Sequence, residues 1–471
     1  MKLRNAGMAC AVVGALASAS ASGSGFSLLE QNASGLGRAF AGTAAIADDA
    51  TTVYFNPAGL ARLKGVQVAA AASGVNVNTS FRNSGSLPAL GQALGGEGGN
   101  AGGLSIVPAV YLSVPLTDSL TFGLGLNAPF GLKTDYDEGW MGRFQALRSE
   151  VKTINVNPAL AWAPNEHMSF GVGVSYQRIK AVLTNAVNYD AVVYSGVYGS
   201  VYAAALQAGL TPAQAAAAAA AQAGGLVALV PGLQGAARVE GNDTAWGFNL
   251  GALFDLGDST RVGIAYRSAI KYGVTGNVDF VAPTTANPTA ALVIQAASGG
   301  PLADGPVGLD LKLPDSATLS LVQQVGDRAS LSFDAARTGW SSVPQLQIVR
   351  AGGAVLSTTP EKWKDTWRFA LGGDCKIAAN WTVRAGIAYD QAPVPDTTRT
   401  PRLPDNHRTW FAVGAGWDPT SALHVDLGYA HLMVKDAPLN QNAGSAAAYG
   451  LLAGTQKTHI DIVAAQLAMK F

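Results

Sequence analysis

The residues best suited to acid–base chemistry are a histidine and an aspartate two positions apart. His424 and Asp426 would point the same way from a β-strand, and with a nearby serine they could form the catalytic group of a lipase. The sequence contains no Gly-x-Ser-x-Gly elbow, Walker loop or paired-cysteine metal spacing. A solvated polar pair is therefore the favoured interpretation. We expect no catalytic residue, metal or cofactor, and a serine that reacts with acyl-directed probes would contradict this.

The elements that hold such residues must suit a membrane. Of the 471 residues 48% are hydrophobic and only 13% are charged, and 56 are glycine. Beyond the first 20 or so residues there is no uninterrupted apolar run of about 18, which a spanning helix requires. A closed β-barrel is the other structure that satisfies every backbone hydrogen bond inside lipid. The 31 basic and 31 acidic residues cancel, which argues against a nucleic-acid partner.

The start of the chain carries a targeting signal. Lys2 and Arg4 precede a short apolar stretch that ends in the small residues Ala19-Ser20-Ala21. This pattern predicts a secretory signal peptide over residues 1–21.

Alternation of apolar and polar residues recurs through the rest of the chain. The runs 119–127 and 381–390 are clear examples of this two-residue period, which is typical of strands. Short turns and long loops follow one another strictly between the runs. An even strand count with short turns at one end is typical of bacterial outer-membrane barrels. The sequence predicts an all-β fold, a fourteen-stranded antiparallel transmembrane β-barrel over residues 65–471, with strands near 66–79, 104–116, 119–130, 143–163, 167–183, 244–256, 259–281, 307–323, 328–338, 363–375, 380–390, 407–418, 421–433 and 457–471.

Residues 22–64 lack this alternation and are rich in Gly, Ala and Asp. A barrel of this size is too wide for its own side chains to fill, so the segment is expected to fold inside it as an N-terminal hatch. Asn56, Pro57 and Ala58 would form a preset turn there, because proline fixes φ and the Asn56 side chain can replace a missing backbone hydrogen bond. The alternative is a surface turn before the first strand.

Several motifs, in order along nearly the whole mature chain, resemble the FadL-type outer-membrane transporters of long-chain fatty acids and other hydrophobic compounds. They are Ser24-Gly25-Phe26, Ser34 to Gly42, Ala45 to Ala50, Asn56-Pro57-Ala58, Asn127 to Leu132, Leu313 to Ser316, Trp363 to Gly372, Arg384 to Asp390, Pro393-Val394-Pro395 and Leu403-Pro404-Asp405. The resemblance implies a hatch, an apolar ligand pocket and no open water channel. It also implies that Gly25 and Phe26 form the mobile N-terminus, and that Asn56-Pro57-Ala58 is the hatch motif.

The resemblance further implies that ligand leaves sideways into the membrane at a kinked third strand, residues 119–130. Gly123, Gly125 and Pro129 are suited to interrupting strand pairing there. The alternative is that the glycines thin the wall for close packing.

One long loop carries a second apolar feature. Thr211, Pro212 and Gln214 begin a helix over residues 211–223. Leu226, Val227 and Leu229 follow it and would form an apolar patch that collects ligand at the barrel mouth. The alternative is packing against neighbouring loops.

The sequence is compatible with two classes of ligand. A fatty acid would favour a cation near its carboxylate, and Arg384 and Arg350 are candidates, whereas a neutral hydrocarbon would need none. The alternative function is a non-selective porin or a structural barrel. A final strand that ends in Phe471 resembles the recognition signal of the barrel assembly machinery. We expect a monomer in contact with the lipid of the outer membrane of a Gram-negative bacterium.

Overall fold

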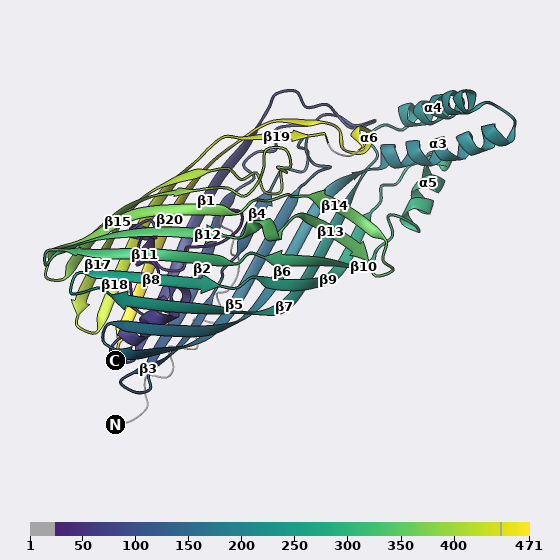
Figure 1. Ribbon diagram of the computed structural model, residues 1–471. Coiled ribbons are helices and arrows are strands. Elements are labelled where there is room, and N and C mark those ends of the chain that lie inside the picture. Colours follow the sequence, from purple (N-terminus) through teal and green to yellow (C-terminus); the bar gives the residue numbers. More distant parts are fainter. Residues whose placement is uncertain (1–23, 443–444) are drawn as a thin grey trace, which may run out of the picture.

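The computed structural model describes residues 24–442 and 445–471, which form a closed antiparallel β-barrel with a short helical segment inside it (Figure 1). The expected signal peptide lies outside the described residues. No helix within the described ranges is both long and apolar enough to cross a membrane.

The chain passes along the barrel fourteen times, as predicted, because several passes are divided into two labelled strands. The divided passes are β3 with β4, β8 with β9, β10 with β11, and β18 with β19, while β13 and β14 form a hairpin above the wall. The strands are β1 (Gln67–Asn83), β2 (Gly103–Pro115), β3 (Leu120–Asn127), β4 (Gly131–Asp135), β5 (Arg148–Asn165), β6 (Met168–Asn188), β7 (Gln234–Asp255), β8 (Thr260–Arg267), β9 (Ile270–Val281), β10 (Gly305–Leu313), β11 (Ser316–Val325), β12 (Ala329–Thr338), β13 (Gln345–Arg350), β14 (Val355–Pro360), β15 (Thr366–Ala378), β16 (Trp381–Asp390), β17 (Arg408–Thr420), β18 (Leu423–Val434), β19 (Ala437–Gln441) and β20 (Leu452–Lys470).

The first and last strands close the barrel. The antiparallel ladder between β1 and β20 runs from the pair Gln67 and Lys470 to the pair Asn83 and Gly454. Strand β1 also pairs with β2 on its other side. Closure removes the unpaired strand edges that an open sheet would expose to lipid.

Apolar side chains point outward around the wall. On β5 and β6, for example, Val156, Leu160, Val172 and Val174 are exposed, and the polar Asn157 between Val156 and Leu160 is buried. This arrangement is that of a membrane barrel, in which the apolar face meets lipid and the other face lines the lumen.

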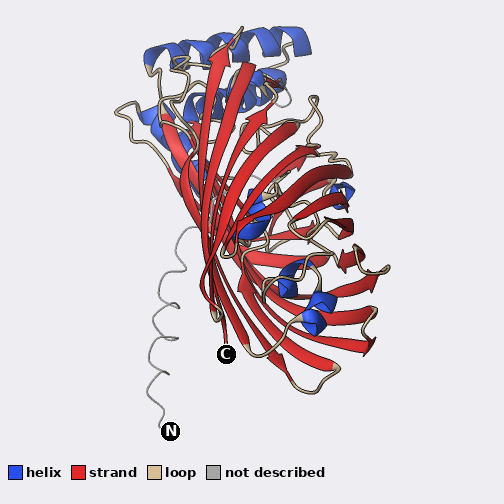
Figure 2. Ribbon diagram, turned by 90° about the vertical axis from the view of Figure 1, so that its left-hand side faces the viewer, coloured by secondary structure: helices blue, strands red, loops and turns tan. Residues whose placement is uncertain are grey.

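Helices gather at the two ends of the hollow. The segment inside the barrel contains α1 (Ala33–Gly37), α2 (Thr52–Phe55) and the 3₁₀ helix η2 (Pro57–Arg62), whereas α3 (Tyr189–Gln207), α4 (Pro212–Leu229) and α5 (Pro288–Ser298) project beyond the end opposite the termini (Figures 1 and 2). The short elements η3 (Trp340–Ser342) and α6 (Ala446–Tyr449) lie in loops.

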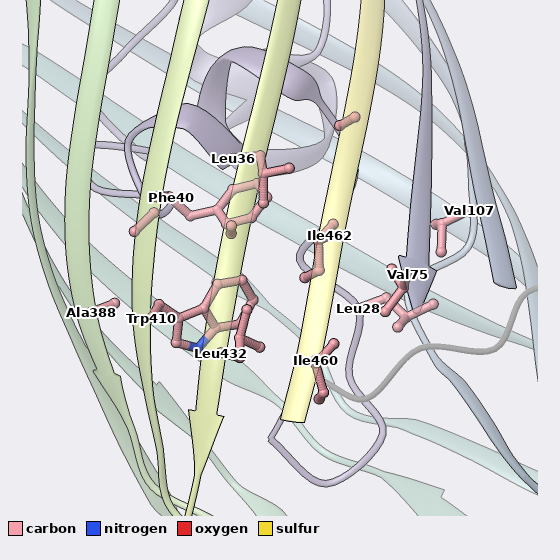
Figure 3. Packing of buried hydrophobic residues seen from close by; sticks show 14 of the residues in the cluster. Leu28, Leu36, Phe40, Val75, Val107, Ala388, Trp410, Leu432, Ile460 and Ile462 are labelled. Carbon is pink, nitrogen blue, oxygen red and sulfur yellow. The ribbon is translucent and has the colours of Figure 1, made fainter. Parts of the chain in front are cut away.

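The inner segment packs against the lumen face of the wall. Leu36 and Phe40 point toward Trp410, Leu432 and Ile462 in one buried cluster (Figure 3). Its residues 30–64 are called the hatch body below, and residues 24–28 are called the hatch tip.

Candidate functional site

The turn at Asn56 lies inside the barrel, so the alternative of a surface turn is wrong. The Asn56 side chain is fully buried, and its Oδ1 accepts the backbone N–H of Ala58 at 3.0 Å. Its Nδ2 donates to the carbonyls of Ala44 at 2.6 Å and Ala252 at 3.1 Å. Pro57 is the first residue of η2. One side chain therefore caps the helix and ties the hatch body to strand β7.

Two wall glycines allow the hatch body to approach this closely. A Cβ atom at Gly251 would lie 1.8 Å from Asn56 Oδ1, and one at Gly263 would lie 1.9 Å from the Ala44 carbonyl oxygen. Any larger residue would have to push the hatch body inward.

A network of charged side chains holds the hatch body at the end of the barrel where the termini lie. Arg38 donates to Asp374 at 2.9 Å, and the same carboxylate oxygen accepts from Arg384 at 2.8 Å. Arg384 also donates to the fully buried Asp426 at 2.5 Å. The Nε2 atom of His424 lies 3.0 Å from Asp426 Oδ2. His424 and Asp426 are thus engaged in ion pairs that reach the hatch.

This network corrects the expectation for Arg384. Its guanidinium group is already bonded to two carboxylates. Arg384 and Arg38 both line the cavity between the hatch body and the barrel wall. These bonds favour a structural role for Arg384 over contact with a ligand carboxylate. Arg350, the other candidate, donates to the carbonyl of Pro301 in an outer loop.

The hatch tip reaches up the lumen into a group of aromatic rings. The Phe26 ring centroid lies 5.0 Å from that of Trp340 and 5.8 Å from those of Phe130 and Trp363. We call Phe130, Trp340 and Trp363 the aromatic cage. Gly25 adopts a left-handed φ of 63°, and its N–H donates to Asp405 at 2.8 Å. Phe26 thus fills a buried apolar site whose wall comes from three distant parts of the chain.

The hatch tip also pairs with the interrupted third pass. Strand β3 ends at Asn127 and β4 begins at Gly131. Within this break the Pro129 carbonyl accepts the N–H of Leu28 at 2.8 Å, and the Gly131 N–H donates to the Phe26 carbonyl at 2.9 Å. The backbone of the tip therefore supplies partners that a neighbouring strand would supply elsewhere.

The break interrupts strand pairing in the wall. Pairing between β2 and β3 stops at Val110 and Leu126, and in the described residues β4 forms a ladder with β5 alone. The two sides meet again where the N–H of Asp135 donates to the Ala101 carbonyl at 2.9 Å. Between these points the backbone of the hatch tip takes the place of a strand partner, and we call this stretch of the wall the window.

The expectation that glycines interrupt this strand is wrong. Gly123 and Gly125 are paired on both sides of β3, with β2 and with β5. A Cβ at Gly123 would meet Leu60 of the hatch body at 2.6 Å. The alternative of close packing is the correct one, and of the three predicted residues only Pro129 lies at the break.

The outer apolar run differs from the expected exposed patch. Helix α4 continues through Gly224 and Gly225 to Leu229, beyond the predicted end at residue 223, and Thr211 and Gln214 form the expected capping box. Val227 is buried, and Leu226 packs against a buried cluster that includes Tyr189, Val193 and Ala223. Only Leu229, 75% exposed, faces water.

Two charged residues near the cage were not predicted. Trp363 donates from Nε1 to the Glu361 carboxylate at 2.8 Å, and burial raises the pKa of Glu361 to about 7. Burial also lowers the pKa of Arg402 to about 10, while Glu361 acts in the opposite direction. Arg402 donates to Ser149 Oγ at 3.1 Å and to Asn185 Oδ1 at 3.2 Å. Glu361 and Arg402 are brought together by contacts between loops that are distant in the sequence, so no local sequence pattern predicts them.

A closed barrel with a hatch in its lumen defines a plugged outer-membrane barrel. Residues 14–471 match the family described as "Outer membrane protein transport protein (OMPP1/FadL/TodX)". The chain belongs to this family, as the resemblance indicated, and it is a transport protein of the outer membrane of a Gram-negative bacterium. No group of three or more potential metal-binding side chains occurs in the part of the chain that the structure describes.

Individual relatives cover almost the whole chain. Outer membrane protein P1 of Haemophilus influenzae is 31% identical over 439 residues, which is 89% of this chain and 88% of that protein. The long-chain fatty acid transport protein of Escherichia coli K12 is 30% identical over 436 residues, 92% and 93% of the two chains. The crystal structure of a FadL homologue from Pseudomonas aeruginosa has a TM-score of 0.81 at 25% identity, and covers 95% of this chain and 100% of that one.

Proposed function

We propose that the protein takes up hydrophobic compounds, with long-chain fatty acids as the first candidates. The observation that carries this proposal is the Phe26 ring, which occupies a buried apolar site while its backbone covers the window in the wall. The similarity to a long-chain fatty acid transport protein over 92% of the chain supports the choice of ligand.

In this mechanism the ligand replaces Phe26 inside the aromatic cage. Burial of a phenylalanine side chain is worth about 1.5–3 kcal/mol, and an acyl chain in the same place recovers a similar amount. The small cavity beside the site, about 30 Å³ and lined by Leu132 and Leu403, leaves no room for both. Displacement of Phe26 withdraws the tip from Pro129 and Gly131, and the ligand then leaves through the window between β2 and β4.

Arg402 is the cation that we propose for a fatty-acid carboxylate. It is half-buried, it lies close enough to Glu361 to affect the pKa of that carboxyl, and Glu361 is bonded to a residue of the cage. Because Glu361 is protonated below pH 7, it leaves the positive charge of Arg402 available to an acid ligand. A neutral hydrocarbon would not need this charge.

Binding to the purified protein tests the proposal. We expect saturable binding of a radiolabelled long-chain fatty acid, which Phe26→Ala tightens about tenfold because the competing ring is gone, and which Arg402→Gln weakens. Phe81→Ala is the matched control, since Phe81 is equally buried but belongs to another cluster. Binding of a neutral aromatic hydrocarbon alone would exclude the acid. Steady ion conductance with no binding of either ligand would favour the non-selective porin.

The remaining roles follow from the same picture. We propose that residues 22–64 act as the hatch domain and residues 65–471 as the barrel domain, that the protein works as a monomer, and that it has no catalytic role. Phe471 is 72% exposed at the end of the barrel, which supports its use as a recognition signal during barrel assembly.

A further inference from the structure

The outward face of strands β5, β6 and β7 changes abruptly from apolar to charged. Even-numbered residues of all three strands point outward, and in the lower part they are Val156, Val174 and Phe248. Tyr176 and Trp246 end this apolar region, with ring centroids 4.8 Å apart. Aromatic side chains in this position mark the boundary between acyl chains and headgroups. The next outward residues toward the loops lie at headgroup depth.

A cavity of about 230 Å³ lies at this depth. Its lining residues are Arg148, Glu150, Lys152, Lys180, Val182 and Arg238. All six occupy the outward positions of their strands, so the cavity faces the membrane and is separated by the wall from the aromatic cage. It lies near the loop end of the barrel, because β6 leads into α3 at Asn188 and β7 begins at Gln234.

The charges around the cavity leave a positive surplus. Arg148 and Lys152 share the Glu150 carboxylate, with Arg148 at 2.6 Å, and Lys180 and Arg238 share the Glu240 carboxylate, with Lys180 at 2.6 Å. Four cations therefore surround two carboxylates. A third carboxylate, that of Asp135, lies 3.5 Å from Arg148 at the margin, so the surplus is one positive charge.

The strand register adds an unfavourable contact that an anion would relieve. Lys152 lies directly opposite Lys180 in the ladder between β5 and β6. Like charges directly opposite one another on neighbouring strands repel. A bound anion between the two ammonium groups would turn this repulsion into attraction.

We propose that this cavity binds a phosphate group of lipid A, the phosphorylated glycolipid that anchors lipopolysaccharide in the outer leaflet. Lysine and arginine side chains form short, charge-assisted hydrogen bonds with phosphate. Basic pockets at headgroup depth bind phosphorylated lipid headgroups in the same way. The site is independent of the transported ligand and fixes one lipid against the wall of β5 to β7.

Binding of defined lipids to the full-length barrel in detergent, measured by native mass spectrometry, tests this site. We expect bisphosphorylated lipid A to bind, and Lys152→Gln combined with Lys180→Gln to weaken it about tenfold or more, as expected for two lost charge-assisted contacts. Lys180→Arg keeps the charge and should retain binding. Lys457→Gln is the control, because Lys457 is exposed with one acidic partner, Asp436, and lies on β20.

Three results would overturn the lipid A site. The first is equal binding of dephosphorylated lipid A, and the second is an equal loss of binding in the Lys457→Gln control. The third is inorganic phosphate that binds as tightly as lipid A, which would show an anion site with no preference for lipid. Retained fatty-acid binding by the double variant would show that its lipid defect is not a folding defect.

Discussion

The two parts of the hatch are held in the barrel by different kinds of contact. The body meets the wall through backbone atoms set against glycine, through the buried Asn56 amide and through the ion pairs of Arg38 and Arg384. The tip is held by one aromatic ring and a few backbone hydrogen bonds. An apolar ligand can replace the contacts of a phenylalanine ring, but it cannot replace a buried ion pair.

The difference indicates which part moves. Movement of the hatch body would separate its ion pairs and leave buried charges uncompensated, which costs free energy. The body is therefore expected to stay fixed to the wall. In the proposed mechanism the tip would exchange one apolar contact for another when ligand enters. We therefore expect substitutions in the body to change the stability of the whole barrel, and substitutions in the tip to change only local opening.

The largest effect is expected from Asp426→Ala. Removal of this carboxylate leaves Arg384 buried with half of its partners, and the loss of one member of a buried ion pair costs about 3–5 kcal/mol. Chemical unfolding of the folded barrel measures the free energy. The control is Asp418→Ala, because Asp418 is half exposed and contacts only His424 within this network. Equal losses in the two variants would mean that the network does not hold the hatch body.

Gly263→Ala should destabilise the barrel by about 1–3 kcal/mol, the usual cost of overpacking. The added methyl group would lie 1.9 Å from the Ala44 carbonyl oxygen, which is backbone and cannot turn away. The unfolding temperature reports the change. At Gly273 the nearest atom would be 3.9 Å away, so Gly273→Ala should leave the unfolding temperature almost unchanged.

Glu361 should make stability depend on pH. Its pKa is about 7 in the folded protein and about 4.5 when exposed, so the contribution is full below pH 4.5 and is lost as the pH rises through 7. Glu361→Gln should remove this slope, with a gain of about 1–2 kcal/mol at pH 8. Thermal unfolding between pH 4 and pH 8 measures it. An unchanged slope, or the same response from the exposed Glu138→Gln, would contradict the prediction.

Gly25→Ala should have the smallest effect on the whole barrel and a clear effect on the tip. Alanine at a left-handed φ costs about 1–2 kcal/mol, and its Cβ would lie 2.7 Å from the Trp340 ring. Hydrogen exchange at the Gly131 amide should speed up about tenfold while the unfolding temperature stays constant. Gly209→Ala is the control, because Gly209 also has a positive φ but has no atom within 4 Å of the added methyl group. A fall in the unfolding temperature for Gly25→Ala alone would mean that the tip belongs to the structural body.

Local patterns were sufficient to predict the barrel and the Asn56 turn. Two-residue alternation persists along each pass, and the cap at Asn56 depends on its neighbour Ala58. Local patterns did not predict the ion pairs of Arg384. Alternation shows that its side chain points into the lumen, but it does not show that Arg384 lies at the same level along the barrel as the hatch body. The cage joins Phe26 to loops more than 300 residues away, so no short segment of sequence contains it.

The hydrogen bonds between the hatch tip and the break between β3 and β4 favour the closed position of the tip in the proposed mechanism. When the tip leaves, the Pro129 carbonyl and the Gly131 N–H lose their partners, and an unpaired backbone group away from water costs about 1–3 kcal/mol. A hydrocarbon chain offers no hydrogen bond in exchange. In the proposed mechanism the tip returns once the ligand has left, because its hydrogen bonds with Pro129 and Gly131 form again, and closure needs no external energy source.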